Sequence, residues 1–244
     1  MKKIMFNDKY GLTEAVLKGN KTMTRRMLRL PEYWHGMWVW SFAFDKQSCS
    51  LRLYDADEFP MEDPDTGECA YVNPHYKTGE VVAVAQSYKD VGYTKKWVEQ
   101  HISPNPNAKP TDPFEKKYPG WSNKMFVSAK FMSHQIRITD VKVEMLQDIS
   151  DGDCFKEGII PITWRQHLPQ AIDDLSPQKH IDHNVYSLEK FREGIEDCWA
   201  ESDPNEYMAE DAKTAFAVLI FKMYGRKVWE GNPYVFAYSF ELVK

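Results

Sequence analysis

Strand patterns lie near both ends of this chain, and helical patterns lie between them. Residues 4–6 form a short apolar run, and residues 234–243 form an alternating pattern directly after Pro233, which is typical of strands. This last strand follows a helical pattern at residues 206–224. The mixed order predicts an α+β protein whose core is a small β-barrel or curled sheet with flanking helices.

Local patterns predict the remaining elements. Asn7 or Asp8 can cap the first helix and Ser150 the second, because their side-chain oxygens accept hydrogen bonds from free backbone N–H groups. Glycines at the far ends stop several of these helices. The predicted helices cover residues 8–18, 148–158, 187–199 and 206–224. The predicted strands cover residues 37–44, 48–54, 80–86, 124–131 and 134–146.

Two proline-containing segments are predicted to be insertions. Five prolines between residues 104 and 119 break any long helix there, and residues 161–186 are mostly polar with three more prolines. At roughly 150 residues per domain, the 244 residues fit one large or two small domains. We expect a single domain over residues 1–244, with a loop insertion at about 88–122 and a partly helical insertion at about 160–228.

Composition and motifs exclude several classes of protein. The 31 basic and 36 acidic residues give a net charge of −5, which excludes nucleic-acid binding through bulk positive charge but not through a local basic pocket. No apolar run approaches the roughly 18 residues of a membrane helix. The N-terminus lacks the apolar region of a signal peptide. Motifs of dinucleotide enzymes, P-loop NTPases and α/β-hydrolases are missing.

The cysteines and histidines predict no metal site. The four cysteines stand far apart and form no zinc-spaced cluster, so we expect reduced thiols in a cytoplasmic protein. His180 and His183 are three residues apart in a predicted loop, but catalytic metal sites usually need three protein ligands. We therefore expect neither a metal nor another cofactor.

The densest chemical signal lies at residues 19–26. This short segment follows a predicted helix and combines cations with hydroxyls: Lys21, Arg25, Arg26, Thr22 and Thr24. Such a segment can be a solvated basic turn, or it can hold an anion or a polar base edge. A partly desolvated lysine beside arginine has a lowered pKa and can act as a base or nucleophile.

Two further features allow both a functional and a structural interpretation. Glu157 lies near the end of a predicted helix, where it can be a surface carboxylate or can exchange a proton with a nearby Lys21. The aromatic segment at residues 33–44 can offer a stacking platform for a base, or it can pack in the core. Spacing alone does not decide between these interpretations.

The pattern Gly19-x-Lys21-x-x-Thr24-x-Arg26 resembles the signature of the ASCH domain, a family with a PUA-like β-barrel. Four later segments resemble pieces of the phage and prophage members of this family: residues 78–84, 136–150, 154–159 and 229–236. These pieces span the chain but cover less than half of it. The insertions match no known pattern.

The resemblance implies a barrel with a cleft beside residues 19–26, and RNA or a modified nucleoside as the ligand. A small bacterial branch of the family hydrolyses the amide of acetylated cytidine with a lysine, a threonine and a glutamate. These positions correspond to Lys21, Thr24 and Glu157. By this resemblance Lys21 takes the proton of the Thr24 hydroxyl, Thr24 attacks the acyl carbon, and Glu157 protonates the leaving amine.

We also predict that ligand contacts are made by five further residues: Gly19, Thr22, Arg25, Arg26 and Gln86. Many phage-type relatives carry Arg-Glu where this chain has Ala85 and Gln86, and glutamine can bind a base edge but cannot accept a proton at neutral pH. Binding of RNA or a nucleoside is therefore our first prediction. An N-acylated-nucleoside amidohydrolase and a phage accessory protein that acts by protein contact are the alternatives.

Overall fold

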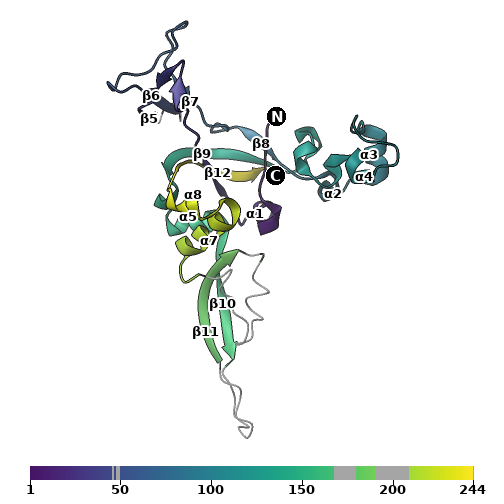
Figure 1. Ribbon diagram of the computed structural model, residues 1–244. Helices are drawn as coiled ribbons and strands as arrows, with labels where there is room; N and C mark the ends of the chain where they lie inside the picture. The colour runs from purple at the N-terminus through teal and green to yellow at the C-terminus, as the bar shows by residue number, and fades with distance from the viewer. Residues whose placement is uncertain (46, 48–49, 168–179, 189, 191–208, 244) are drawn as a thin grey trace.

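The centre of the molecule is a five-stranded sheet that combines both ends of the chain (Figure 1). The computed structural model describes residues 1–45, 47, 50–167, 180–188, 190 and 209–243. The strand order is β1 (Lys3–Ile4), β8 (Val81–Val84), β9 (Gln135–Met145), β12 (Tyr234–Val243) and β2 (Met23–Met27). Among the described strands of this sheet, β1 and β8 pair in parallel and the other neighbours pair antiparallel. The predicted α+β class and the strands at 80–86, 134–146 and 234–243 are confirmed.

The longest strand of the sheet, β9, is curved (Figure 1). The register of β9 and β12 shifts between Ser239 and Phe240, as expected where a bulge bends a strand. At the two edges, the Arg26 side chain of β2 donates a hydrogen bond to the carbonyl oxygen of Met5, which directly follows β1. The two outer strands therefore approach each other, although no ladder within the described residues joins them.

Four helices lie together beside the sheet: α1 (Leu12–Leu17), α5 (Asp151–Lys156), α7 (Ala212–Tyr224) and α8 (Arg226–Glu230) (Figure 1). Their apolar side chains join strand residues such as Ile136, Val235 and Tyr238 in the main core. The predicted caps are confirmed, since Asn7 accepts from Lys9 N–H and Ser150 accepts from Asp153 N–H.

The predicted first helix is interrupted. A 3-10 turn, η1 (Asp8–Tyr10), precedes α1, and between them Gly11 has a φ of +67°, which glycine adopts at little cost. The last predicted helix is α7, which starts at Ala212 rather than at 206 because Asp211 caps it by accepting from Thr214 N–H. Residues 206–208 lie outside the described residues.

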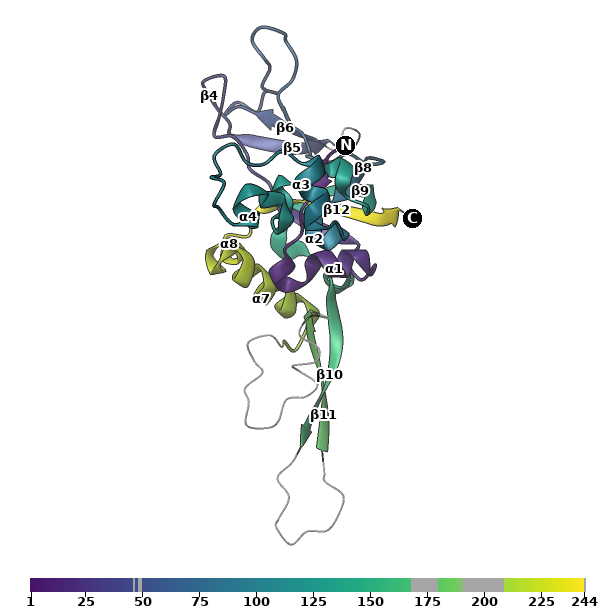
Figure 2. The same ribbon diagram turned by 90° about the vertical axis from the view of Figure 1, so that its right-hand side faces the viewer.

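The structure corrects the loop that was predicted around His180 and His183, within the insertion at 161–186. Residues Ile159–His167 form β10 and residues His180–Leu188 form β11, an antiparallel hairpin that projects from the body of the protein (Figures 1 and 2). Pro161 fits because a two-stranded ribbon has only edge strands, where a missing N–H can be tolerated. Two residues of the helix predicted at 187–199 belong to β11, and most of the others lie outside the described residues.

The structure also corrects the segment from 88 to 131, which we call the helical lobe. Where a loop was predicted, it forms α2 (Tyr88–Val91), α3 (Lys95–His101), α4 (Phe114–Lys117) and η2 (Pro119–Trp121). The strand predicted at 124–131 is wrong, because this segment forms the 3-10 turns η3 (Lys124–Phe126) and η4 (Ala129–Phe131). The prolines lie between helices or at their first positions, and a small separate core holds the lobe together.

A second projection comprises residues 31–72, which we call the aromatic lobe (Figures 1 and 2). Its strands are β3 (Tyr33–Trp34), β4 (Met37–Trp38), β5 (Ser41–Asp45), β6 (Ser50–Tyr54) and β7 (Tyr71–Val72). The predicted hairpin is confirmed as β5 and β6, but Met37 and Trp38 pair with β3 in a separate ribbon. Across the described residues, no helix is both long and apolar enough to span a membrane.

Candidate functional site

A cavity of about 360 Å³ lies between β2, the segment after β1, helix α7 and the turn at residues 123–125. Five predicted site residues line it together: Lys21, Thr24, Arg25, Arg26 and Glu157. Its apolar wall comes largely from α7, including Phe216, Leu219 and Ile220. The fold thus places Glu157 beside residues 19–26. Sequence spacing alone did not establish this proximity.

Two glycines with positive φ allow Lys21 and Glu157 to meet. Gly19 follows α1 with a φ of +79°, and Gly158 follows Glu157 with a φ of +101°. A Cβ atom on Gly158 would lie 3.7 Å from the Lys21 Cβ. The end of α5 therefore packs directly against the segment that carries Lys21.

Lys21 and Glu157 form a buried ion pair. Lys21 Nζ donates to the Glu157 carbonyl oxygen at 2.8 Å and to its carboxylate oxygen Oε2. The two side chains are only 1% and 5% exposed. Burial lowers the pKa of Lys21 because it penalises the ammonium form, and the Glu157 carboxylate only partly offsets this effect. Lys21 therefore gives up its proton more readily than a surface lysine.

Arg25 fixes the second carboxylate oxygen of Glu157. Its Nη1 donates to Glu157 Oε1 at 3.1 Å, while its Nε donates to Glu144 at 2.8 Å and its Nη2 to Asp153 at 3.2 Å. The guanidinium carbon also lies 5.9 Å from the centre of the Phe216 ring. Both oxygens of Glu157 thus have cationic partners, which restrict the orientation of its carboxylate.

Asp153 anchors this network from helix α5. It accepts from Lys142 at 2.8 Å and from Lys156 at 3.1 Å, in addition to Arg25. Burial opposes ionisation of Asp153, but these cations outweigh it and lower its pKa to about 2. The carboxylate is therefore charged at neutral pH and helps to hold Arg25 in place.

Thr24 lines the same cavity from strand β2. The side chain is largely buried, yet its hydroxyl makes no hydrogen bond with any residue that the structure describes, Lys21 included. The Thr24 hydroxyl oxygen is also not fully shielded from solvent. The hydroxyl is therefore accessible from the cavity and is not occupied by a structural contact.

Three predicted ligand-binding residues lie outside the cavity lining. Gly19 is exposed, and the Thr22 backbone N–H donates to the Lys156 carbonyl oxygen at 2.8 Å. Gln86 is buried after β8, where its side-chain oxygen lies 2.7 Å from His134 Nδ1. Their ligand-binding roles stay predictions.

Sequence reasoning missed several residues that complete the site. Asp153 and Glu157 lie four residues apart, so they share one side of α5, and this spacing was a usable signal for a common cation. The α7 wall was missed because α7 belongs to a segment that was interpreted as an insertion. Glu144 lies on a strand that was predicted, but its local pattern did not indicate a contact with Arg25. The described residues contain no group of three potential metal ligands, and the side chains of His180 and His183 are not described.

No family model, curated protein or solved structure matches this chain. Membership in the ASCH family therefore stays a prediction from its motifs. The function has to be inferred from the geometry of the cavity.

Proposed function

We propose that this protein binds an N-acylated nucleoside in the cavity and hydrolyses its amide bond. The observation that carries the proposal is the common cavity of Lys21, Thr24 and Glu157, with both carboxylate oxygens of Glu157 held by cations. The cavity volume of about 360 Å³ lies within the range of small-molecule sites. Lysine, threonine and glutamate supply the base, nucleophile and acid that acyl transfer requires.

Acylation begins when the proton of the Lys21–Glu157 pair resides on Glu157, which leaves a neutral amine on Lys21. The amine takes the proton of the Thr24 hydroxyl as the oxygen attacks the acyl carbon. Glu157 then donates its proton to the leaving nucleoside nitrogen, and the C–N bond breaks. The step leaves an acyl ester on Thr24, an ammonium on Lys21 and a carboxylate on Glu157.

Deacylation reverses these proton transfers. The Glu157 carboxylate takes a proton from water as the hydroxyl attacks the ester, and Lys21 returns a proton to the Thr24 oxygen. The carboxylic acid leaves, and the pair regains its starting form. Because Lys21 Nζ contacts Glu157 and not Thr24, the amine has to turn toward Thr24 or use one bridging water.

We also propose the PUA-like barrel as the finer description of the fold. The contact from Arg26 on β2 to the Met5 carbonyl oxygen beside β1 supports a sheet that curls until its edges approach each other. The candidate cavity would then be the cleft between these edges. A cytoplasmic location is proposed as well, and the free thiols of Cys69 and Cys154 are consistent with it.

The proposal is tested with a panel of N-acylated nucleosides that includes acetylcytidine, followed by chromatography. Thr24→Val removes the hydroxyl at nearly constant volume, and Thr24→Ser keeps it. We expect wild-type turnover, a loss of at least about 10³-fold in Thr24→Val, and measurable activity in Thr24→Ser. Absence of turnover across the panel would leave a protein that only binds RNA or a nucleoside, and it would reject the hydrolase.

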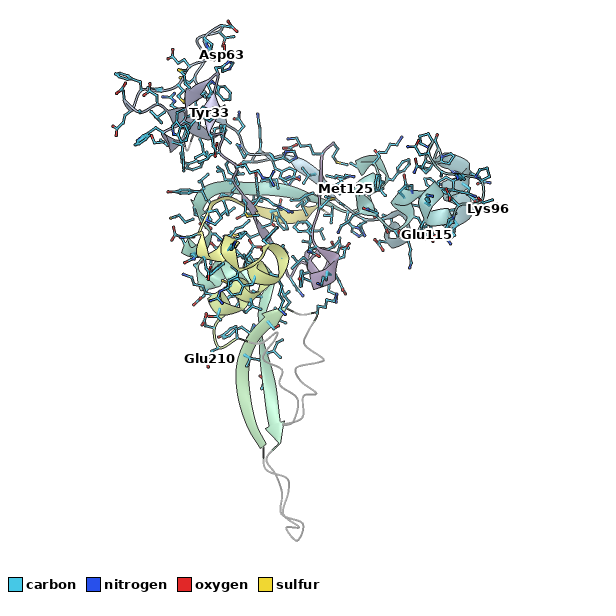
Figure 3. All side chains as sticks on the ribbon, viewed as in Figure 1. Tyr33, Asp63, Lys96, Glu115, Met125 and Glu210 are labelled. Carbon is cyan, nitrogen blue, oxygen red and sulfur yellow. The ribbon has the colours of Figure 1, made fainter. Side chains whose placement is uncertain are left out.

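A second candidate function is protein contact through the aromatic lobe. Large side chains are exposed there, with Trp40 at 66% and Phe59 at 67%, and residues 55–68 contain seven acidic residues but no lysine or arginine. Tyr33 and Asp63 lie in this lobe, well away from Met125 of the cavity wall (Figure 3). Apolar side chains with acidic neighbours favour a partner whose apolar patch has a basic rim.

This second candidate has its own test. A photo-crosslinker placed at Trp40 should form one defined adduct in producing cells, and the adduct should disappear when Asp57 and Glu58 are changed to Asn and Gln. The same crosslinker placed at Lys96 in the helical lobe is the matched control (Figure 3). If Trp40 and Lys96 give the same adducts, the aromatic lobe is not a specific partner surface.

A further inference from the structure

A second cavity, of about 680 Å³, adjoins the candidate site. The two cavities share Met5, Arg26 and Met125 in their walls. The second cavity extends past the end of β2 toward residues 72–76, the segment that leaves the aromatic lobe. None of the proposed catalytic residues lines it.

The charge of this second cavity is unusual for an acidic protein. Lys3, Arg26 and Arg29 line it together with His75, and none of the aspartates and glutamates that the structure describes does. The whole chain carries a net charge of −5. A concave surface with two arginines and a lysine, and with no described carboxylate beside them, attracts an anionic group of the ligand.

Neighbouring arginines of β2 differ in how they are paired. Arg25, which lines the first cavity, contacts the three carboxylates of Glu144, Asp153 and Glu157. Arg26 has no carboxylate partner among the described residues, since it donates to the Met5 carbonyl oxygen and lies 5.7 Å from the centre of the Phe6 ring. Arg29 is exposed and makes no ion pair or hydrogen bond within the described part of the chain.

Lys3 contributes positive charge to the cavity, but the N–H donors of its ammonium are already used within the protein. Its ammonium donates to the carbonyl oxygens of Lys124, Met125 and Val127 at 3.1, 2.6 and 2.7 Å. The groups that remain available to an anion are therefore the guanidinium groups of Arg26 and Arg29. A planar guanidinium matches the oxygens of a phosphate in geometry as well as in charge.

The strand geometry connects the two cavities. Thr24 and Arg26 are two residues apart on β2, so their side chains leave the same side of the strand. Thr24 lines only the first cavity, while Arg26 borders both. A ligand whose acyl group lies at Thr24 can therefore extend past Arg26 into the second cavity.

We propose that the second cavity receives a phosphate ester and that the ligand of this site is a nucleotide rather than a free nucleoside. Arg26 and Arg29 would hold the phosphate. The inference rests on the proposed function for the nucleoside part of the ligand. The phosphate can be the terminal group of a mononucleotide or a link within an RNA strand.

The test compares affinities by calorimetry and needs no turnover, because the probes are reaction products. They are cytidine, cytidine 5′-monophosphate, cytidine 3′-monophosphate and a trinucleotide of cytidine. Arg29→Gln removes the unpaired cation, and Arg226→Gln is the matched control, since Arg226 is 79% exposed and pairs with Glu230 at 2.8 Å on α8. Each comparison is made at low and at high salt.

We expect at least one phosphorylated probe to bind about tenfold more tightly than cytidine. This advantage should nearly vanish in Arg29→Gln, persist in Arg226→Gln and shrink with salt. A preference for a monophosphate identifies a terminal phosphate, and a preference for the trinucleotide identifies a strand. Equal affinity for all probes, or binding of none, overturns the inference even if acetylcytidine is hydrolysed. A phosphate advantage without turnover supports the inference while the hydrolase fails.

Discussion

The substitution Glu157→Gln tests whether Lys21 and Glu157 form a buried ion pair or a surface ion pair. The substitution keeps the volume of the side chain but removes the charge that faces Lys21 and Arg25. Leaving one member of a buried pair uncompensated typically costs about 3–5 kcal/mol of stability. For a chain of this size that corresponds to a fall in Tm of roughly 6–20 °C.

The pH dependence of this loss has a definite sign. Burial holds the pKa of Lys21 below its ordinary value, and Glu157 partly offsets this, so Glu157→Gln should lower the pKa of Lys21 further. Between the folded pKa and the unfolded value of 10.5, the unfolded chain binds more protons at Lys21 than the folded chain. Stability of the variant should therefore recover as pH rises toward about 10.

Urea unfolding followed by tryptophan fluorescence between pH 6 and 10 measures both effects. Glu144→Gln is the control, because its carboxylate also contacts Arg25 but does not contact Lys21. The double variant Lys21→Met/Glu157→Gln should be more stable than Glu157→Gln alone, since no uncompensated ammonium remains. A loss below about 1 kcal/mol in Glu157→Gln, the usual value for a surface pair, would refute the buried pair.

Three other predictions concern the residues around the site. The Asp153 carboxylate, with a pKa of about 2, should contribute up to about 2 kcal/mol to the free energy of unfolding above pH 4, and this contribution should be lost as pH falls through 2. Acid unfolding of Asp153→Asn should lack this pH-dependent loss of stability. Gly158→Ala should cost at least about 1 kcal/mol in urea unfolding because its φ is +101°, whereas the same change at Gly152, in the helix α5, should not destabilise. Burial raises the pKa of the Cys154 thiol to about 12, so peptide mapping should find it unalkylated at pH 8 until the protein unfolds, and early alkylation would contradict its burial.

Local sequence patterns predicted the parts of the fold that local physics controls. The long strands β9 and β12 and the caps at Asn7 and Ser150 depend on neighbouring residues, and they are present. The hairpin β10–β11 was missed because Pro161 was interpreted as a breaker, although a two-stranded ribbon tolerates it. The helical lobe was missed because α2 and α4 have only four residues each, too few for a helical period.

The candidate site also combines residues that local sequence predicted with contacts that only the folded chain forms. The motif at residues 19–26 identified Lys21, Thr24 and the two arginines, but its spacing did not bring Glu157 to Lys21 from 136 residues away. That contact depends on how α5 packs against β2. The different pairing of Arg25 and Arg26 was also not predictable, because it depends on carboxylates from β9 and α5 that only the folded chain brings together.

The proposed hydrolysis of an acylated nucleoside requires Thr24 to be the nucleophile. The most direct measurement mixes the protein with acetylcytidine, quenches within the first turnover and maps the adduct by peptide mass spectrometry. We expect one acetyl group on the peptide that contains Thr24, and no acetyl group on this peptide in Thr24→Val. An acetyl group on Lys21, or turnover that persists in Thr24→Val, would contradict it.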